Sequence, residues 1–109
     1  MPSFRIQVPN SRPREEKVAR LRSFVSRMER KFAGNISQAR SEWTDDRMTF
    51  SLVFHGFRIA GTMTVENEEV IVEGRIPILA VPFMRRIEDE IAHAITEELA
   101  DSDATVRIG

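Results

Sequence analysis

The residues that could do chemistry in this sequence are few, and the most suggestive pair lies near its C-terminal end. Glu90 and His93 form a Glu-x-x-His pair, and Asp89 and Glu97 each lie four residues from His93. One such pair supplies half of the ligands of a di-iron site in a helical bundle, and a second helix must supply the rest. The first predicted helix contains no histidine. Because metal ligands must converge on one point, we expect His93 to be a solvent-facing residue of an acidic helix.

His55 is the second candidate, because it precedes Gly56 at the tip of a predicted hairpin. A histidine in a loop could act as a general base. The sequence offers it no obvious partner: there is no cysteine and no tyrosine, no Gly-x-Ser-x-Gly motif and no glycine-rich phosphate loop. We expect His55 to be an exposed turn residue. No catalytic, cofactor-binding or metal-binding residue is assigned, and no cofactor is expected.

The composition limits the class of protein. A chain of 109 residues suits a single domain, and 41% hydrophobic with 30% charged residues is typical of a globular one. No apolar run approaches the roughly 20 residues that cross a bilayer, and no signal peptide is predicted at the N-terminus. The absence of cysteine excludes disulfides and fits a cytoplasmic location. We predict one domain over residues 1–109, with an ordered core over about 3–100 and a short tail at 101–109.

The charge is nearly balanced, at −1, which gives no reason to expect nucleic-acid binding. Its distribution is uneven, because basic residues dominate the first 65 positions and acidic residues dominate the remainder. A basic stripe on the first predicted helix contains Arg20, Arg27 and Lys31. We interpret these charges as solvated helix faces. Electrostatic complementarity, within the fold or between copies of the chain, is the alternative.

The elements that position these residues are organised around the middle of the chain, from Arg47 to Ile76. Large apolar side chains recur there at every second position, on both sides of the His55-Gly56 pair: Met48, Phe50, Leu52 and Phe54, then Phe57, Ile59, Met63 and Val65. Alternation of this length is typical of half-buried strands. A third run spans Val70 to Ile76. We predict an antiparallel meander with one apolar face, and a tight turn in which Gly56 has a positive φ.

The segments before the meander predict a strand, a helix and a further strand. Residues 4–8 alternate as a short strand, and a helix runs from about Pro13 to Phe32 with Ser11 as its N-cap and Gly34 as its left-handed C-cap. Its buried stripe is Val18, Leu21, Val25, Met28 and Phe32, with Phe24 on the flank. Residues 36–43 form a strand near a sheet edge. We expect the indole N–H of Trp43 to reach a hydrogen-bond partner.

After the meander, an apolar connector at 78–81 leads to a second helix that opens with Pro82 and ends near Ala100. The predicted buried stripe of this helix is Phe83, Ile87, Ile91, Ala94 and Ile95, with Met84 and Leu99 beside it. The polar residues of this helix, including His93, are predicted to face away from the buried stripe. Val106 and Ile108 in the tail could add a minor strand.

The element order is therefore β-α-β-β-β-β-α. One amphipathic sheet and two amphipathic helices need a shared interior, and helices on one face of an antiparallel sheet provide it. The predicted fold class is α+β: a two-layer sandwich. Both helices are needed on the apolar face of the sheet, so its polar face must meet water or another molecule. A homodimer, formed through that face or through a free sheet edge, is expected.

The junction between the last strand and the second helix carries a family resemblance. Residues 72–77, Val-Glu-Gly-Arg-Ile-Pro, are followed by Leu79, Pro82-Phe83 and Ile87-Glu88-x-x-Ile91. Together with Arg14-Glu15-Glu16, Trp43 before an acidic turn and Met48-x-Phe50, they resemble the small bacterial proteins called polyhydroxyalkanoic acid system proteins. The resemblance covers about residues 4–99. It implies an association with polyhydroxyalkanoate storage granules and supplies no active site to carry over.

The sequence is compatible with three functions. The leading hypothesis is a non-enzymatic cytoplasmic protein of the polyhydroxyalkanoate system that binds a granule surface, a granule protein or itself. The second is a domain that holds a small apolar ligand, such as an acyl chain, between the helices and the sheet. The third is an enzyme that uses His55 or His93. An interaction module needs an exposed apolar patch, a ligand binder needs a cavity, and an enzyme needs a histidine with a partner in a concave site.

Overall fold

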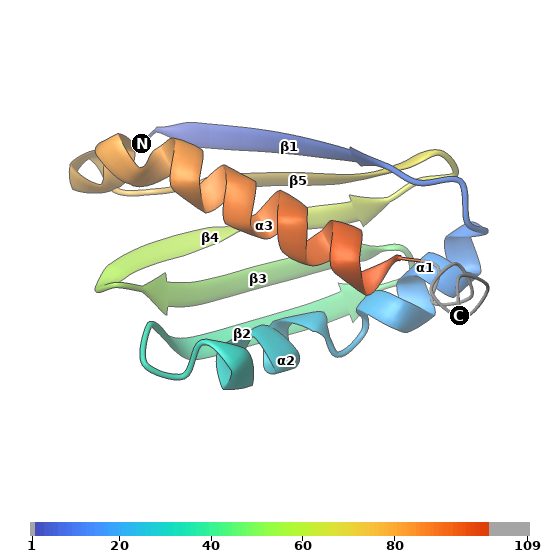
Figure 1. Ribbon diagram of the computed structural model, residues 1–109, viewed down its shortest axis with the longest axis horizontal. Coiled ribbons are helices and arrows are strands. Elements are labelled where there is room, and N and C mark those ends of the chain that lie inside the picture. Colours follow the sequence, from blue (N-terminus) through green and yellow to red (C-terminus); the bar gives the residue numbers. More distant parts are fainter. Residues whose placement is uncertain (1, 101–109) are drawn as a thin grey trace, which may run out of the picture.

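The computed structural model describes residues 2–100, which form a five-stranded antiparallel sheet with the helices on one face (Figure 1). In chain order the elements are β1 (Ser3–Pro9), α1 (Arg14–Leu21), α2 (Phe24–Lys31), β2 (Ile36–Thr44), β3 (Arg47–Phe54), β4 (Phe57–Val65), β5 (Glu69–Arg75), the 3-10 helix η1 (Ile78–Phe83) and α3 (Met84–Glu98). The strand order across the sheet is β1-β5-β4-β3-β2. The predicted fold class, an α+β two-layer sandwich, is confirmed.

The register of the meander follows the predicted alternation. Met48 lies opposite Met63, and Leu52 lies opposite Ile59, so that side chains of one parity share the face that the helices cover. Met48, Ile59 and Met63 are almost completely buried there. The His55-Gly56 pair makes the predicted tight turn, with φ of 49° and 83° at the two residues. Positive φ at both central positions is the geometry that matches the twist of a two-residue hairpin.

The first helix differs from the prediction, because two helices replace the single one expected over 13–32. The chain turns at Arg22 and Ser23, and this turn brings Phe24 into the core at 7% exposure although it was predicted on the flank. Arg27 stabilises the break: its guanidinium donates to the carbonyl oxygen of Arg20 at 3.0 Å and to Ser23 Oγ at 2.6 Å. A carbonyl at the end of α1 therefore regains a hydrogen bond that the turn removes.

Both predicted caps of this helical region are wrong. The residue that precedes α1 is Pro13 and no side chain caps the helix; instead Asn10 Oδ1 accepts a hydrogen bond from the backbone N–H of Arg12 at 2.9 Å. Gly34 does not adopt a positive φ. After α2 the chain turns through backbone hydrogen bonds from the N–H groups of Asn35 and Ile36 to the carbonyl of Phe32.

β2 is an edge strand, as predicted, but an irregularity changes which of its side chains face inward. The register with β3 shifts between Ser37 and Arg40, and Gln38 has a φ of 51°. A bulge of this kind lets Ile36 be buried while Ala39, three residues later, packs against the core. The expectation for Trp43 is wrong: within residues 2–100 the buried indole Nε1 has no hydrogen-bond partner.

The last helix begins two residues later than predicted, at Met84, because residues 78–83 form a 3-10 helix that contains Pro82. Ile87 and Ile95 are buried as expected. Phe83 is not, since its side chain lies at the end of η1 and is 50% exposed. The minor strand expected at Val106 and Ile108 falls outside the described residues.

Candidate functional site: an apolar cleft beside an exposed apolar segment

The two histidines lie at different places on the surface. His93 faces solvent on α3, and its Nε2 lies 2.6 Å from Glu97 Oε1. Among residues 2–100, no three histidine, aspartate or glutamate side chains are grouped so that they could hold a metal ion. His55 is exposed in the turn between β3 and β4, as predicted, with its ring edge-on to Phe54 at a centroid distance of 4.3 Å. His55 and His93 are therefore exposed on different elements, one in the β3–β4 turn and the other on α3.

Two members of the predicted basic stripe bind the end of α3. Arg27 forms an ion pair with Glu98 at 2.6 Å, and Arg20 donates to the carbonyl oxygen of Ala100 at 3.2 Å. Arg12, outside the stripe, donates to the carbonyl oxygen of Leu99 at 2.9 Å. Cations near a helix C-terminus are favourable because unpaired carbonyls point there. The complementarity between the basic first half and the acidic second half thus operates within the fold, while Lys31 remains exposed.

An apolar cleft lies between α2 and α3, above the sheet. α3 packs on β1 and α2 packs on β2, so that the inner face of β3 lies between the two helices (Figure 1). The side chains of Phe50, Leu52 and Phe54 on this face are consequently only half-buried. They form the floor of a cavity of about 150 Å³. A cleft of this kind is the feature that the ligand-binding hypothesis requires.

The walls of the cleft are almost entirely apolar. The helices and the other strands contribute a set of aliphatic, aromatic and methionine side chains: Phe24, Val25, Met28, Phe32, Ile36, Met48, Ile59, Met63, Val72, Ile87 and Ile91. Several of these were predicted as core residues. What the sequence does not reveal is that the helices stand far enough apart to leave space between them. Spacing between two layers depends on where each helix docks, and periodicity carries no information about it.

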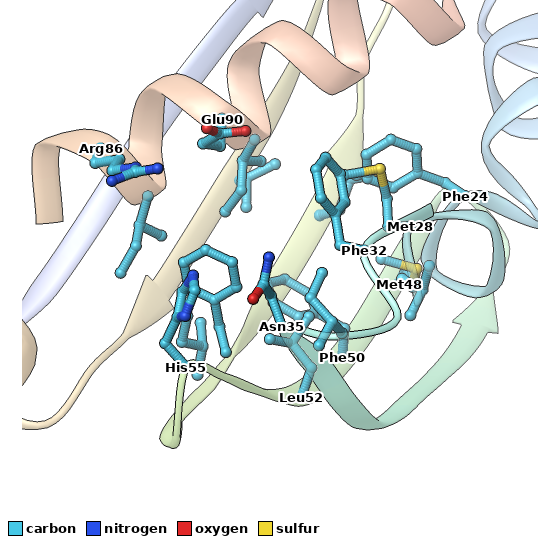
Figure 2. Close-up of a pocket in the computed structure, with 18 residues that line it drawn as sticks. Phe24, Met28, Phe32, Asn35, Met48, Phe50, Leu52, His55, Arg86 and Glu90 are labelled. Atoms are coloured by element: carbon cyan, nitrogen blue, oxygen red, sulfur yellow. The ribbon is translucent and has the colours of Figure 1, made fainter. Parts of the chain in front are cut away.

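Polar groups occur only at the opening. Figure 2 shows Arg86 and Glu90 on the α3 side, with His55 and Asn35 at the opposite side. The backbone N–H of His55 donates to the carbonyl oxygen of Asn35 at 2.9 Å, which joins the β3–β4 turn to the loop after α2. Arg86 and Glu90 are both exposed, and within the described chain neither side chain forms a hydrogen bond or an ion pair. The opening therefore presents one free cation and one free anion above an apolar interior.

A second apolar feature lies beside this opening. Four large side chains of η1 point into solvent, with exposed fractions of 73% for Ile78, 79% for Leu79, 42% for Val81 and 50% for Phe83. Ala80 alone turns inward and is fully buried, which fixes the segment to the fold. The sequence analysis predicted residues 78–81 as a connector and Phe83 as a buried helix residue. A cluster of exposed large apolar residues is unusual on a monomeric protein and marks a contact surface.

Lys17 is a buried charged residue that the sequence analysis missed. Its Nζ donates to the carbonyl oxygens of Asn10 and Asn67, at 2.7 and 2.9 Å, so that it ties the end of β1 to the β4–β5 turn. Burial lowers the pKa of Lys17 below its usual 10.5; Arg14 acts in the same direction, and Glu68 and Glu69 oppose the shift. The sequence feature that could have indicated the burial of Lys17 is its position four residues before Leu21, on the buried side of α1.

No helix within residues 2–100 is long and apolar enough to cross a membrane. Fold and site together define a small α+β domain with an apolar cleft and an exposed apolar segment, a class of protein suited to binding. Residues 4–99 match the family described as "Putative polyhydroxyalkanoic acid system protein", and the chain belongs to that family. No curated protein and no solved structure matches the chain.

Proposed function

We propose that this protein is a non-enzymatic, cytoplasmic component of the polyhydroxyalkanoate system that binds the granule surface through residues 78–83. The observation that carries the proposal is the exposure of Ile78, Leu79, Val81 and Phe83 in one short segment. Membership of the family supplies the granule as the surface to be bound.

The physical basis is the removal of apolar side chains from water. Full burial of a leucine or isoleucine side chain contributes about 1.5–3 kcal/mol. Ile78 and Leu79 are the two most exposed of the four, so each should contribute at least about tenfold to the affinity for an apolar surface. Arg85 and Arg86 follow the segment after Met84 and place positive charge next to it. Such an arrangement suits an apolar surface that carries anionic groups.

Sedimentation with granules tests the proposal. Washed granules from polymer-storing cells are mixed with the purified protein, and the bound fraction is measured after centrifugation. The variant Ile78→Ser with Leu79→Ser should bind at least about a hundredfold more weakly. Its stability should change little, because both side chains already face water. The matched control is Val53→Thr with Ala60→Ser, which introduces two hydroxyl groups on the opposite face of the sheet.

Three outcomes are informative. Equal binding by the serine variant and the wild type would refute the role of residues 78–83. Absence of the wild-type protein from the granule fraction of the cell would refute a granule role altogether. Binding to native granules but not to protein-stripped granules would identify a granule protein, rather than the polymer surface, as the partner.

A second function, binding of a small apolar ligand, is supported by the cleft. Protein interiors rarely leave voids larger than a water molecule, yet this cleft has a volume of about 150 Å³ and walls that are almost entirely apolar. Surface binding is proposed for the apolar side chains of residues 78–83 and ligand binding for the interior of the cleft, so the two functions are compatible in one chain.

A further inference from the structure

We infer that the cleft between α2 and α3 binds a hydroxyacyl chain, with the apolar tail inside and the hydroxyl and carbonyl groups at the opening. The inference rests on the second proposed function and goes further by naming the chemical class of the ligand. It is argued from the size of the cavity, the chemistry of its walls and the balance of charge at its mouth.

The size of the cavity sets the length of the tail. A dry protein cavity of about 150 Å³ lined by aliphatic and aromatic side chains accommodates benzene, and this cleft has the same volume and the same kind of lining. The enclosed part of a ligand should therefore contain about six carbon atoms. The floor, from Phe50, Leu52 and Phe54, contains no polar side chain that would favour a polar tail.

The charged side chains at the opening of the cleft determine which polar groups the ligand should have. Arg86 offers hydrogen-bond donors and a positive charge, while Glu90, one helical turn later, offers acceptors and a negative charge. Side chains four residues apart on a helix have Cβ atoms about 5–6 Å apart, so both can reach the same ligand. A simple fatty carboxylate would meet attraction from Arg86 and repulsion from Glu90. A ligand that accepts from one and donates to the other satisfies both.

A hydroxyacyl group has this pairing. Its carbonyl oxygen can accept from the Arg86 guanidinium, and its hydroxyl can donate to the Glu90 carboxylate. In a 3-hydroxyacyl chain one carbon separates the hydroxyl-bearing carbon from the carbonyl carbon, so both groups fit above one opening. His55 and Asn35 on the opposite side supply further donors and acceptors (Figure 2). No covalent step is involved, because the ligand is held and not transformed.

Titration with a defined set of esters tests the inference. Methyl esters of 3-hydroxyalkanoic acids and of the corresponding alkanoic acids, of increasing length, are added to the full-length protein, and affinity is measured by calorimetry. Affinity should rise roughly fourfold per added carbon until about six carbons follow the hydroxyl-bearing carbon. Loss of the hydroxyl should weaken binding about tenfold or more, because a hydrogen bond to a charged group is lost.

Two variants locate the polar contacts. Glu90→Ala should weaken binding of the hydroxylated esters about tenfold and leave the esters without a hydroxyl unchanged. Asp89→Ala, which removes an exposed neighbouring carboxylate that does not line the cleft, is the matched control and should change neither. Amide chemical shifts of wild-type protein provide a readout that requires no variant: the changes should concentrate at Leu52, His55 and Ile87.

The outcomes separate this inference from the function on which it rests. Equal affinity for the two ester series, with shifts in the cleft, would refute the hydroxyacyl assignment and leave apolar-ligand binding in place. Shifts elsewhere on the surface, or no binding by any ester, would refute both. Surface binding through residues 78–83 is unaffected by either result.

Discussion

The rings of Phe57 and Phe83 lie with their centroids 6.0 Å apart, and their contact joins the start of β4 to the end of η1. Phe57 directly follows the His55-Gly56 turn, which borders the opening of the cleft. Phe83 belongs to the exposed apolar segment and lies one helical turn before Arg86, at the same opening. The two apolar features of this protein are therefore neighbours at one end of the molecule.

Leu52 and Ile59 form a cross-strand pair that distinguishes the cleft from the core. From the sequence alone, Leu52→Ala is predicted to lower the free energy of unfolding by about 2–5 kcal/mol if that side chain is fully buried. Leu52 is only half-buried in the cleft, whereas Ile59 is 2% exposed. We expect Ile59→Ala to lower the free energy of unfolding by about 2–5 kcal/mol and Leu52→Ala to lower it by roughly half as much. Denaturant unfolding, followed by the fluorescence of Trp43, provides the measurement. Equal losses for the two variants would show that the cleft closes in solution.

Gly74 is a position where a methyl group cannot be added without movement. A Cβ there would lie 2.5 Å from the ring of Phe4 and 2.9 Å from the carbonyl oxygen of Ala60. We expect Gly74→Ala to destabilise the protein by about 1–3 kcal/mol through overpacking. Combining it with Phe4→Leu should recover part of the loss, because the two sites share a contact. Gly34→Ala is the control: a Cβ at Gly34 meets nothing within 4 Å, so its stability should be equal or slightly higher.

Lys17 should give the protein a distinctive alkaline stability profile. Because burial lowers its pKa in the folded state from 10.5, the unfolded chain holds the proton more tightly. Between the folded-state pKa and 10.5 the unfolded chain binds more protons, so the free energy of unfolding rises with pH across that window. Below the window both states are protonated, and the full cost of burying the ammonium group is present. Lys17→Met should remove this rise.

Denaturant unfolding at several pH values up to 10.5 measures this effect, with Lys31→Gln as the control for an exposed lysine. The sequence contains no tyrosine or cysteine, which simplifies the alkaline titration. An identical slope in the wild type and in Lys17→Met would contradict the assignment of the rise to Lys17.

The parts of the fold that were predicted correctly are those with local signals. The alternation from Met48 to Val65 determines which face of the meander is buried, because a shift by one residue would place every side chain on the other face. The turn at Gly56 has a glycine where positive φ is required. These two signals also place His55 at the exposed turn where it was expected. Sequence order does not determine that β1 pairs with β5, since that contact joins residues far apart in the chain.

The parts that were missed depend on tertiary contacts. The apolar stripe continues across Arg22 and Ser23 without a helix-breaking residue, so that the division into α1 and α2 had no local signal. Phe83 has the hydrophobicity of a core residue, and hydrophobicity does not indicate whether a side chain faces the interior or a partner. The cleft depends on the positions of two helices on one sheet. Both features proposed to carry function therefore required the structure.

The outer face of the sheet carries the last prediction. No described helix covers this face, which presents Thr49 and Ala60 exposed, with Thr62 half-buried in the middle of β4. Charged side chains on this face have partners within the chain: Arg5 lies 3.7 Å from Glu73, and Arg58 donates to Gln38 at 3.2 Å. What remains for a second copy is the central strip of threonine and small apolar side chains, which suits the packing of one sheet on another. We expect a homodimer that uses this face or a free edge at β1 or β2.

Light scattering at micromolar concentration should give the mass of two chains. Thr62→Arg should convert the dimer to monomers if the face itself is the contact, because a long charged side chain would have to be buried between the sheets. The variant should remain folded, since the new side chain can extend into solvent in the monomer and can reach Glu73 on β5, which lies opposite Thr62. Thr62→Val preserves the shape and the apolar character and should leave the mass unchanged. A dimer that tolerates Thr62→Arg would place the contact at an edge strand or a helix. A monomer at every concentration would refute self-association, and the face would then contact water or a granule partner.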